Sequence, residues 1–276
     1  AATHLGSIFL LGRLFPALAG PAGGVFVVSG VGLRTQRFAS YVALFRHDLK
    51  GLLAYSTVSH LGLVTLLFGL GTPLGEIAAV FHIINHAVFK ASLFMAAGIV
   101  DHETGTRDIR RLHGLYRVMP ITGTLALVAS AAMAGVPLLN GFLSKEMFFA
   151  ETYFLSAHPG VEFALPVVAT LAGLFAVVYA LRFSVDIFFG PKSDDLPREP
   201  HEPVRWMRVP IELLVLACLV VGGLMEGLGL SAASSSGSRL PGRSDRSSAP
   251  RRVRWSAARC PSSASRSGTA STPRWR

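Results

Sequence analysis

The chain has 276 residues, of which 51% are hydrophobic and only 15% are charged, with a mean hydropathy of +0.48. Soluble domains carry about a quarter of their residues as charged side chains, so this composition excludes an ordinary soluble protein and favours a membrane protein. The net charge of +10 does not indicate nucleic-acid binding, because ten Arg and one Asp in residues 231–276 contribute +9 and leave +1 for the rest of the chain.

Seven apolar segments are candidate membrane spans, since a helix needs about 20 apolar residues to cross roughly 30 Å of hydrocarbon. The first is short, and Arg34, Thr35, Gln36 and Arg37 interrupt the second. The pattern predicts an all-α, polytopic membrane protein with about seven transmembrane helices. The segments are residues 5–20, 23–45, 51–71, 77–100, 118–156, 162–190 and 208–230.

The fifth segment is too long for one straight helix and contains GVPLLNG, residues 135–141, where Gly135, Pro137 and Gly141 predict a break. Basic residues concentrate in 46–50, 107–117 and 192–208. These three loops share the cytoplasmic side only if residues 118–156 cross once. We therefore expect one discontinuous helix, with unwound backbone at membrane depth where protein or water surrounds it.

The segment 77–100 carries His82, His86 and Lys90 at intervals of four residues. Such residues share one face of a helix, with about 6 Å of rise between neighbours. A cationic residue at the bilayer centre costs roughly 2.5–3.5 kcal/mol, so this face should meet protein or water rather than lipid. The stripe predicts a proton wire that runs along this helix. The alternative is that these residues only form hydrogen bonds that fix helix packing.

Four other ionisable residues are candidates for the same path or for simpler roles. Lys145 follows the predicted break and either joins the path or reaches from a helix end toward the interface. His60, in the polar run YSTVSH, is a relay residue or a packing contact. Asp101 is expected to be solvated at the interface, and Lys50 belongs to a basic loop. Two cysteines, in an apolar run and in the tail, predict neither a disulfide framework nor a metal site.

Three stretches resemble the antiporter-like membrane subunits shared by respiratory complex I and Mrp-type cation/proton antiporters. Among them, the motif AAGIVDHETGTRDIRRLHGL followed by GFLSKEMFFAET resembles the A-type subunits of Mrp-type Na+/H+ antiporters more than the proton-pumping subunits of complex I, and the first motif is the most specific. The resemblance covers about residues 42–230. The stretches are HDLKGLLAYSTVSHLG (47–62), FHIINHAVFKASLFMAAGIVDHETGTRDIRRL (81–112) and MAGVPLLNGFLSKEMFF (133–149).

The resemblance implies two inverted five-helix repeats, each with one discontinuous helix, and a hydrated chain of Lys, His and Glu at the membrane midplane. Lys90 matches the central relay lysine, with His82 and His86 as its partners. Lys145 matches the lysine on the second broken helix, and Lys50 matches a further lysine that the family keeps. The implied function is Na+/H+ antiport within a multi-subunit complex of the plasma membrane, without a bound cofactor.

The ends of the chain depart from the family pattern. Leu5 stands near the position of a family lysine, and the helix that carries the partner glutamate is absent, so we expect a fragment. Residues 1–41 are interpreted as a truncated or aberrant remnant of the first repeat, 42–190 as the second-repeat core, and 191–230 as a cytoplasmic loop and a further span. Residues 231–276, with fourteen Ser and ten Arg, are predicted to be disordered. An aberrant terminus is favoured over a lipid- or nucleic-acid-binding arm.

Two other functions remain open from the sequence. One is a proton-pumping membrane subunit of complex I or of a membrane-bound hydrogenase, and the other is a scaffold that anchors partner subunits without transport. Lys90 separates the scaffold from the transporters, because only a transporter should lose function when this residue is replaced while its complex still assembles.

Overall fold

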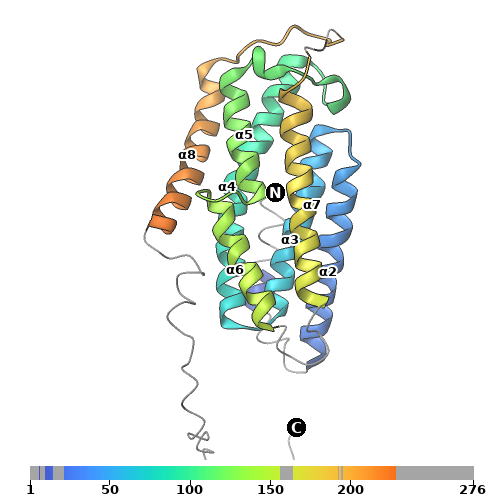
Figure 1. Cartoon of the computed structure of the whole chain (residues 1–276), viewed down its shortest axis with the longest axis vertical. Coiled ribbons are helices and arrows are strands. Elements are labelled where there is room, and N and C mark those ends of the chain that lie inside the picture. Colours follow the sequence, from blue (N-terminus) through green and yellow to red (C-terminus); the bar gives the residue numbers. More distant parts are fainter. Residues whose placement is uncertain are drawn as a thin grey trace, which may run out of the picture. The chain divides into compact units, whose positions relative to one another are not determined.

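The computed structural model describes residues 6, 10–14, 22–155, 164–191, 193 and 195–227, and this part is helical without a β-strand. The helices fall within one compact unit and run side by side (Figure 1). Their bounds are α2 Ala22–Leu44, α3 Leu49–Gly69, α4 Pro73–Thr104, α5 Pro120–Ala134, α6 Asn140–Leu155, α7 Ala164–Phe188 and α8 Arg205–Gly227, with 3₁₀ turns η1 Ile109–Arg111 and η2 Leu115–Arg117.

Local sequence signals set the helix ends. Asp48 caps α3 by accepting a hydrogen bond from the Gly51 amide at 2.7 Å, and Thr72 caps α4 ahead of a proline in its first turn. Helix α4 ends at Gly105, whose φ of 72° is in the left-handed region that glycine adopts without strain. Helix α4 is thus one continuous helix from Pro73 to Thr104, so residues spaced four apart share one face along it.

The predicted break is present. Helix α5 ends at Ala134 and is capped by Gly135, with φ of 86°, and α6 begins at Asn140. Leu138, between them, also has a positive φ of 69°, so the backbone is not helical here. Figure 1 shows α6 continuing in the direction of α5 after this turn. The long apolar segment is therefore one discontinuous helix, as the sequence predicted, and its single crossing of the membrane stays a prediction.

The three basic loops lie at one end of the helices, as the single crossing requires. The amide of Leu49 donates to the Arg107 carbonyl at 2.9 Å, which joins the first basic loop to the second. The guanidinium of Arg198, in the third, donates to the His102 carbonyl at 3.2 Å. By the positive-inside rule we expect this end to face the cytoplasm.

Four described helices are long and apolar enough to cross a membrane: α3, α4, the Pro166–Phe188 part of α7, and α8. Helix α5 is apolar but shorter, because the break ends it. The predicted first span, apart from residues 6 and 10–14, and the predicted disordered tail 231–276 lie outside the described residues. The count of seven spans thus stays a prediction.

Helix α2 is continuous through its polar interruption and packs very closely on α3. A Cβ on Gly62 would lie 2.5 Å from the Gln36 amide nitrogen, so only glycine permits this approach of the two backbones. The hydroxyls of Ser40 and Ser59 meet 2.6 Å apart in the same contact. The contact sets α2 at the same membrane depth as α3.

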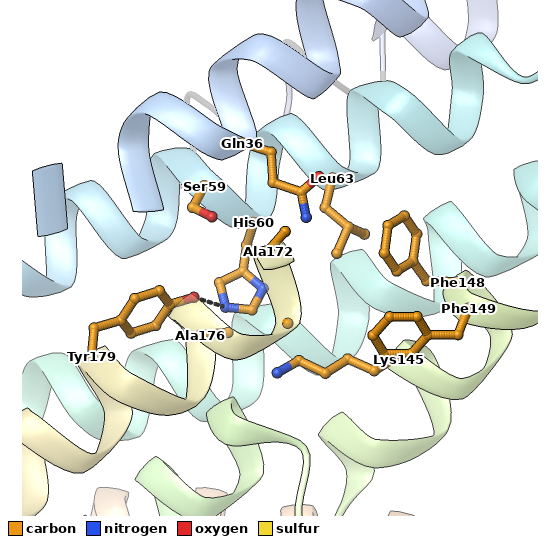
Figure 2. Close-up of a pocket in the computed structure, with 11 residues that line it drawn as sticks. Gln36, Ser59, His60, Leu63, Lys145, Phe148, Phe149, Ala172, Ala176 and Tyr179 are labelled. Atoms are coloured by element: carbon orange, nitrogen blue, oxygen red, sulfur yellow. Dashed lines mark hydrogen bonds between the residues drawn. The ribbon is translucent and has the colours of Figure 1, made fainter. Parts of the chain in front are cut away.

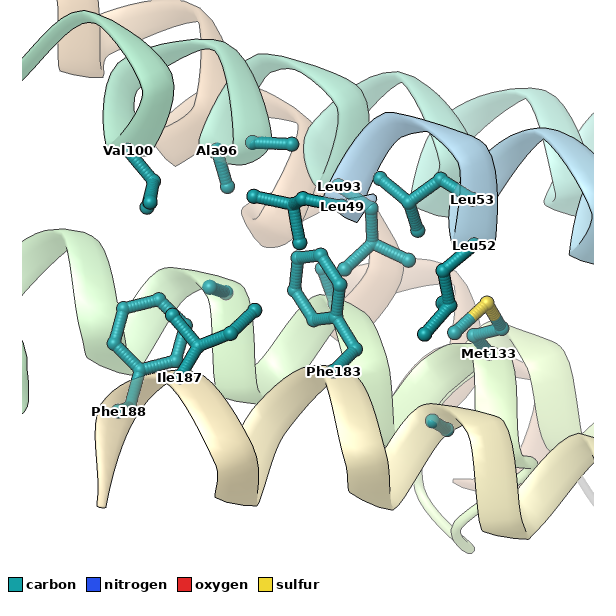
Figure 3. Close-up of a cluster of buried hydrophobic side chains, with 14 of the residues drawn as sticks. Leu49, Leu52, Leu53, Leu93, Ala96, Val100, Met133, Phe183, Ile187 and Phe188 are labelled. Atoms are coloured by element: carbon teal, nitrogen blue, oxygen red, sulfur yellow. The ribbon is translucent and has the colours of Figure 1, made fainter. Parts of the chain in front are cut away.

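A large apolar core fills the bundle between the basic loops and the level of Lys90 (Figure 3). Leucines of α3 and α4 meet the aromatic side chains of α7 there, and each of these side chains is at most 1% exposed. The residues that Figure 3 labels are Leu49, Leu52, Leu53, Leu93, Ala96, Val100, Met133, Phe183, Ile187 and Phe188. This layer separates the polar groups described below from the cytoplasmic loops.

Candidate functional site

The predicted stripe of α4 faces the interior of the bundle. His82 is 0% exposed, and His86 and Lys90 are each 3% exposed. Their hydrogen bonds, however, do not run along α4: those of His82 and Lys90 go to neighbouring helices. The sequence therefore predicted the buried face, whereas the hydrogen bonds of this face lead across the bundle and the proton path itself stays a prediction. Side chains four residues apart on a helix share a face, but their tips can bond across it.

A chain of hydrogen bonds crosses four helices at the level of His82. The Ser144 hydroxyl of α6 lies 2.9 Å from His82 Nδ1, and His82 Nε2 lies 3.0 Å from Nδ1 of His60 on α3. His60 Nε2 lies 3.1 Å from the hydroxyl of Tyr179 on α7, the contact that Figure 2 draws. All four side chains are buried.

This hydrogen-bonded series has two self-consistent arrangements of its protons, because each neutral imidazole has one donor and one acceptor nitrogen. If Tyr179 donates to His60, then His60 donates to His82 and His82 donates to Ser144. If Ser144 donates instead, every bond reverses and His60 donates to Tyr179. Passing one proton along the chain converts the first arrangement into the second.

Lys90 is bound beside this chain. Its ammonium donates to the Ser56 hydroxyl and, at 3.4 Å, to the Leu53 carbonyl of α3. The imidazole of His86 lies between Lys90 and the hydrogen-bonded series, with its ring centroid 5.1 Å from that of His60. Neither nitrogen of His86 has a hydrogen-bond partner in the described part of the chain. A buried imidazole in this state is suited to binding water.

Lys145 is held by the break itself. Its ammonium donates to the carbonyls of Met133 at 2.9 Å and Ala134 at 2.7 Å, which α5 leaves without intrahelical partners at its C-terminus. A Cβ on Gly135 would lie 2.7 Å from Lys145 Cδ, so glycine makes room for this side chain. Gly141 packs against the Ala132 carbonyl for the same reason, whereas Pro137 is exposed in the turn.

Lys145 and His60 line the same small cavity (Figure 2). Its walls include Gln36, Ser59, His60, Lys145 and Tyr179. The space open to a water-sized sphere is about 10 Å³, which suits on the order of one water molecule. The Gln36 side-chain oxygen has no protein partner among the described residues. The cavity is therefore polar enough to hold a bridging water.

Lys50 lies apart from these residues. It begins the first turn of α3, ten residues or about 15 Å of helix from His60. Its ammonium forms an ion pair with Asp101 at 2.6 Å, and both side chains are partly exposed. Asp101 is thus paired, where the sequence analysis expected only solvation. The predicted relay role of Lys50 stays a prediction that its position does not support.

The motif DHETGTRD, residues 101–108, forms the cytoplasmic junction of the helices and no part of the buried path. Glu103, 6% exposed, is held between His102 at 3.0 Å and His201 at 2.9 Å. The Arg110 side chain donates to Asp108, which together with the Arg110 amide lowers the pKa of that carboxyl to about 2. Among the described residues, no three His, Cys, Asp or Glu side chains gather as metal ligands.

Sequence reasoning missed two members of the hydrogen-bonded series, Tyr179 and Ser144. Tyr179 is a single hydroxyl in the apolar run AVVYALRF, and Ser144 stands beside Lys145 in GFLSK. A polar side chain within an apolar span is the only sequence signal for either. Sequence spacing could not pair them with His60 and His82, because the partners lie 119 and 62 residues away.

Comparison with known proteins gives concordant matches. Residues 2–172 match the family model described as NADH:quinone oxidoreductase/Mrp antiporter, TM. A protein of Rhizobium meliloti, the probable A/B subunit of a K(+)/H(+) antiporter, is 64% identical over 78% of this chain and 22% of that protein. The A1 subunit of a Na(+)/H(+) antiporter of Staphylococcus epidermidis is 40% identical over 80% of this chain and 30% of its own length. The chain thus spans less than a third of these relatives.

Solved structures agree with these relatives. The Mrp complex from Dietzia sp. DQ12-45-1b contains a chain with TM-score 0.70 and 36% identity, over 83% of this chain and 24% of that one. Respiratory complex I from Thermus thermophilus matches with TM-score 0.69 and 28% identity, over 83% of this chain and 48% of that one. The fold is the antiporter-like one, and the apolar helices fit a multi-pass protein of the plasma membrane.

Proposed function

This chain belongs to the NADH:quinone oxidoreductase/Mrp antiporter family, and from that premise we propose that it is part of a membrane subunit of a monovalent cation/proton antiporter. Its contribution is to carry protons through buried histidines and lysines. The observation that carries the proposal is the hydrogen-bonded series Ser144, His82, His60 and Tyr179. Buried ionisable groups in a membrane are costly, and function accounts for them better than packing does.

Protons move sideways through this series rather than along α4. A proton that arrives at one end makes the nearest imidazole cationic, and that ring releases the proton on its other nitrogen to the next acceptor. After one passage every hydrogen bond is reversed, so the rings must reorient or return a proton before the next cycle. Lys90, through His86 and water, and Lys145, through the cavity beside Gln36, are the reservoirs, and both meet the series at His60.

The organisation proposed for the chain follows the family. Residues 42–190 form the second-repeat core, 191–230 a cytoplasmic loop and a further span, and 1–41 a remnant of the first repeat. Other subunits of the antiporter complex, the lipid bilayer, Na+ and H+ are its partners, and this part of the protein needs no cofactor and binds no nucleic acid. K+ is the competing cation, since a relative with 64% identity is named for K(+)/H(+) antiport.

Proton flux in membrane vesicles tests the proposal. The His82→Leu substitution, made in the subunit within its complete complex, should abolish flux driven by a Na+ or K+ gradient while the complex still assembles. Thr65→Val, which removes a hydroxyl bonded only within α3 at 2.9 Å, is the matched control. Normal flux in the assembled His82→Leu complex would contradict the proton path and favour the alternative of a scaffold that anchors partner subunits.

The complex I function makes a different prediction. A proton-pumping subunit of an electron-transfer complex would show proton movement during quinone reduction and none in response to a cation gradient alone. Measuring both activities in the same vesicle preparation separates the two members of the family, and recording flux with Na+ and with K+ identifies the cation.

A further inference from the structure

Helix α8 contacts the turn of the break, residues 135–139, through side chains that the proton path does not use. Gly222 and Glu226 are four residues apart on α8 and share one face. A Cβ on Gly222 would lie 2.3 Å from the Leu138 carbonyl oxygen, so glycine alone allows α8 to come this close. Glu226 Oε1 accepts a hydrogen bond from the Leu138 amide at 2.9 Å. Helix α8 therefore holds this turn from outside α5 and α6.

Leu138 adopts a backbone conformation that its side chain disfavours. Its φ is 69°, and among the described residues it is the one residue other than glycine with a positive φ. In this region the Cβ comes too close to the following carbonyl oxygen, so the conformation persists where the surroundings impose it. The Leu138 amide also lies between two helices, at a depth where an unpaired amide is costly. The Glu226 carboxylate pairs the amide and holds the conformation.

The charge of Glu226 suits this task. Leu138 lies two residues before α6 begins, so its amide belongs to the positive N-terminal end of that helix, which stabilises an anion. A hydrogen bond to a carboxylate is also about twice as strong as one to a neutral acceptor. A carboxylate at membrane depth is costly, and this contact with a strained turn gives it a reason to be there.

The same turn positions Lys145. The Lys145 ammonium is bound at 2.9 and 2.7 Å by the last two carbonyl groups of α5. The Val136 amide bonds back to the Ala131 carbonyl at 3.0 Å, and only Pro137 separates Val136 from Leu138. The backbone between Leu138 and the end of α5 is thus short and hydrogen-bonded. A displacement of Leu138 should therefore reach the carbonyl groups that bind Lys145.

We propose that Glu226 is a positioning residue, whose carboxylate holds the turn in the conformation in which the end of α5 binds Lys145. The inference rests on the proposed function, in which Lys145 is a reservoir of the proton path. Glu226 acts through Lys145 and carries no transported proton itself. When the bond to the Leu138 amide is lost, the turn relaxes toward conformations that leucine prefers, and the acceptors of Lys145 move with it.

Substitutions of Glu226 in the complete complex test this role. Glu226→Leu should lower cation-driven proton flux at least about tenfold while the complex still assembles, because a small displacement of a reacting group is sufficient for such a loss. Glu226→Gln, which keeps an oxygen in the same place, should retain most of the flux. Glu212→Leu, the same substitution about 21 Å away along α8, is the matched control. Wild-type flux in Glu226→Leu would overturn the proposal.

Glycine at position 138 separates positioning from proton transfer by Glu226 itself. Glycine adopts a positive φ without strain, so Leu138→Gly combined with Glu226→Leu should restore most of the flux. A carboxylate that carried the transported proton would behave differently. Glu226→Gln would then be as inactive as Glu226→Leu, and Leu138→Gly would restore nothing. Either of these results would refute the positioning role.

Hydrogen exchange tests the contact without the use of transport. In the complete complex, backbone amides of residues 135–139 should exchange at least about tenfold faster in Glu226→Leu than in the wild type, and Glu212→Leu should leave them unchanged. An unchanged exchange rate in Glu226→Leu would refute the proposal even if flux fell. Absence of flux in the wild-type complex would count against the proposed function instead, and the exchange rates would still decide whether Glu226 holds the turn.

Discussion

Replacing Lys90 with Met should remove transport without unfolding the protein. The substitution deletes a cation whose place in the membrane costs about 2.5–3.5 kcal/mol. It also deletes charged hydrogen bonds to Ser56 and Leu53, each worth about 1.5–3 kcal/mol. The Ser56 hydroxyl keeps its own bond to the Leu53 carbonyl at 2.9 Å, so no donor is orphaned. These terms partly cancel and leave a net change between a gain of about 0.5 and a loss of about 3.5 kcal/mol, so we expect the free energy of unfolding to fall by less than about 4 kcal/mol.

Transport should respond very differently to the same substitution. Removal of a group that takes up and releases protons typically lowers a rate by about 100-fold or more. The assay is cation-driven acidification of vesicles that contain the complete complex, with assembly checked by copurification of its subunits. Lys50→Met is the control, because Lys50 is paired with Asp101 outside the buried path and its loss should leave most of the flux. If Lys90→Met keeps more than half of the flux, or if Lys50→Met abolishes it equally, the assignment of the relay is wrong.

Three further substitutions probe the path, the break and the loop. Tyr179→Phe removes the hydroxyl that orients His60, so proton flux should fall several-fold while unfolding shifts by about 1 kcal/mol; unchanged flux would exclude the hydroxyl from the path. Gly135→Ala places a side chain at φ of 86° and against Lys145, and thermal unfolding of the complex should show a loss of about 1–2 kcal/mol or more. The pKa of Asp108 is lowered from 3.8 to about 2, so its contribution to stability is present above pH 3.8 and is lost as the pH falls through about 2. Asp108→Asn should remove this pH dependence of unfolding and lower stability near neutral pH, whereas the two proteins should be equally stable below about pH 2.

The sequence predicted the features that depend on local pattern. Gly135, Pro137 and Gly141 located the break: Gly135 takes a positive φ and Pro137 lies in the turn, whereas Gly141 lies in the first turn of α6, where it packs against the Ala132 carbonyl. The spacing of His82, His86 and Lys90 located a buried polar face, because side chains that cannot face lipid must face protein. Their burial follows from the residue types alone, and so it could be predicted without a partner in sight.

The connections among the buried groups could not be predicted in this way. The bond from His60 to Tyr179 joins α3 to α7, and its existence depends on how the helices pack rather than on either segment. The same holds for Lys145, whose partners are carbonyl groups that become available only where α5 ends. A sequence pattern does not show which backbone carbonyls are free to accept hydrogen bonds. The sequence therefore predicted the position of Lys145 beside the break but not its hydrogen-bond partners.

The apolar layer of Figure 3 determines where the membrane voltage is felt. From Lys90 to Val100 the layer extends about 15 Å along α4 without a charged side chain on that helix. Dry hydrocarbon holds most of an applied potential, and each elementary charge that moves through 100 mV gains or loses about 2.3 kcal/mol. On the proposed function we therefore expect the layer to insulate the basic loops from the polar level, so that charge which enters that level from the side does not leak through the layer.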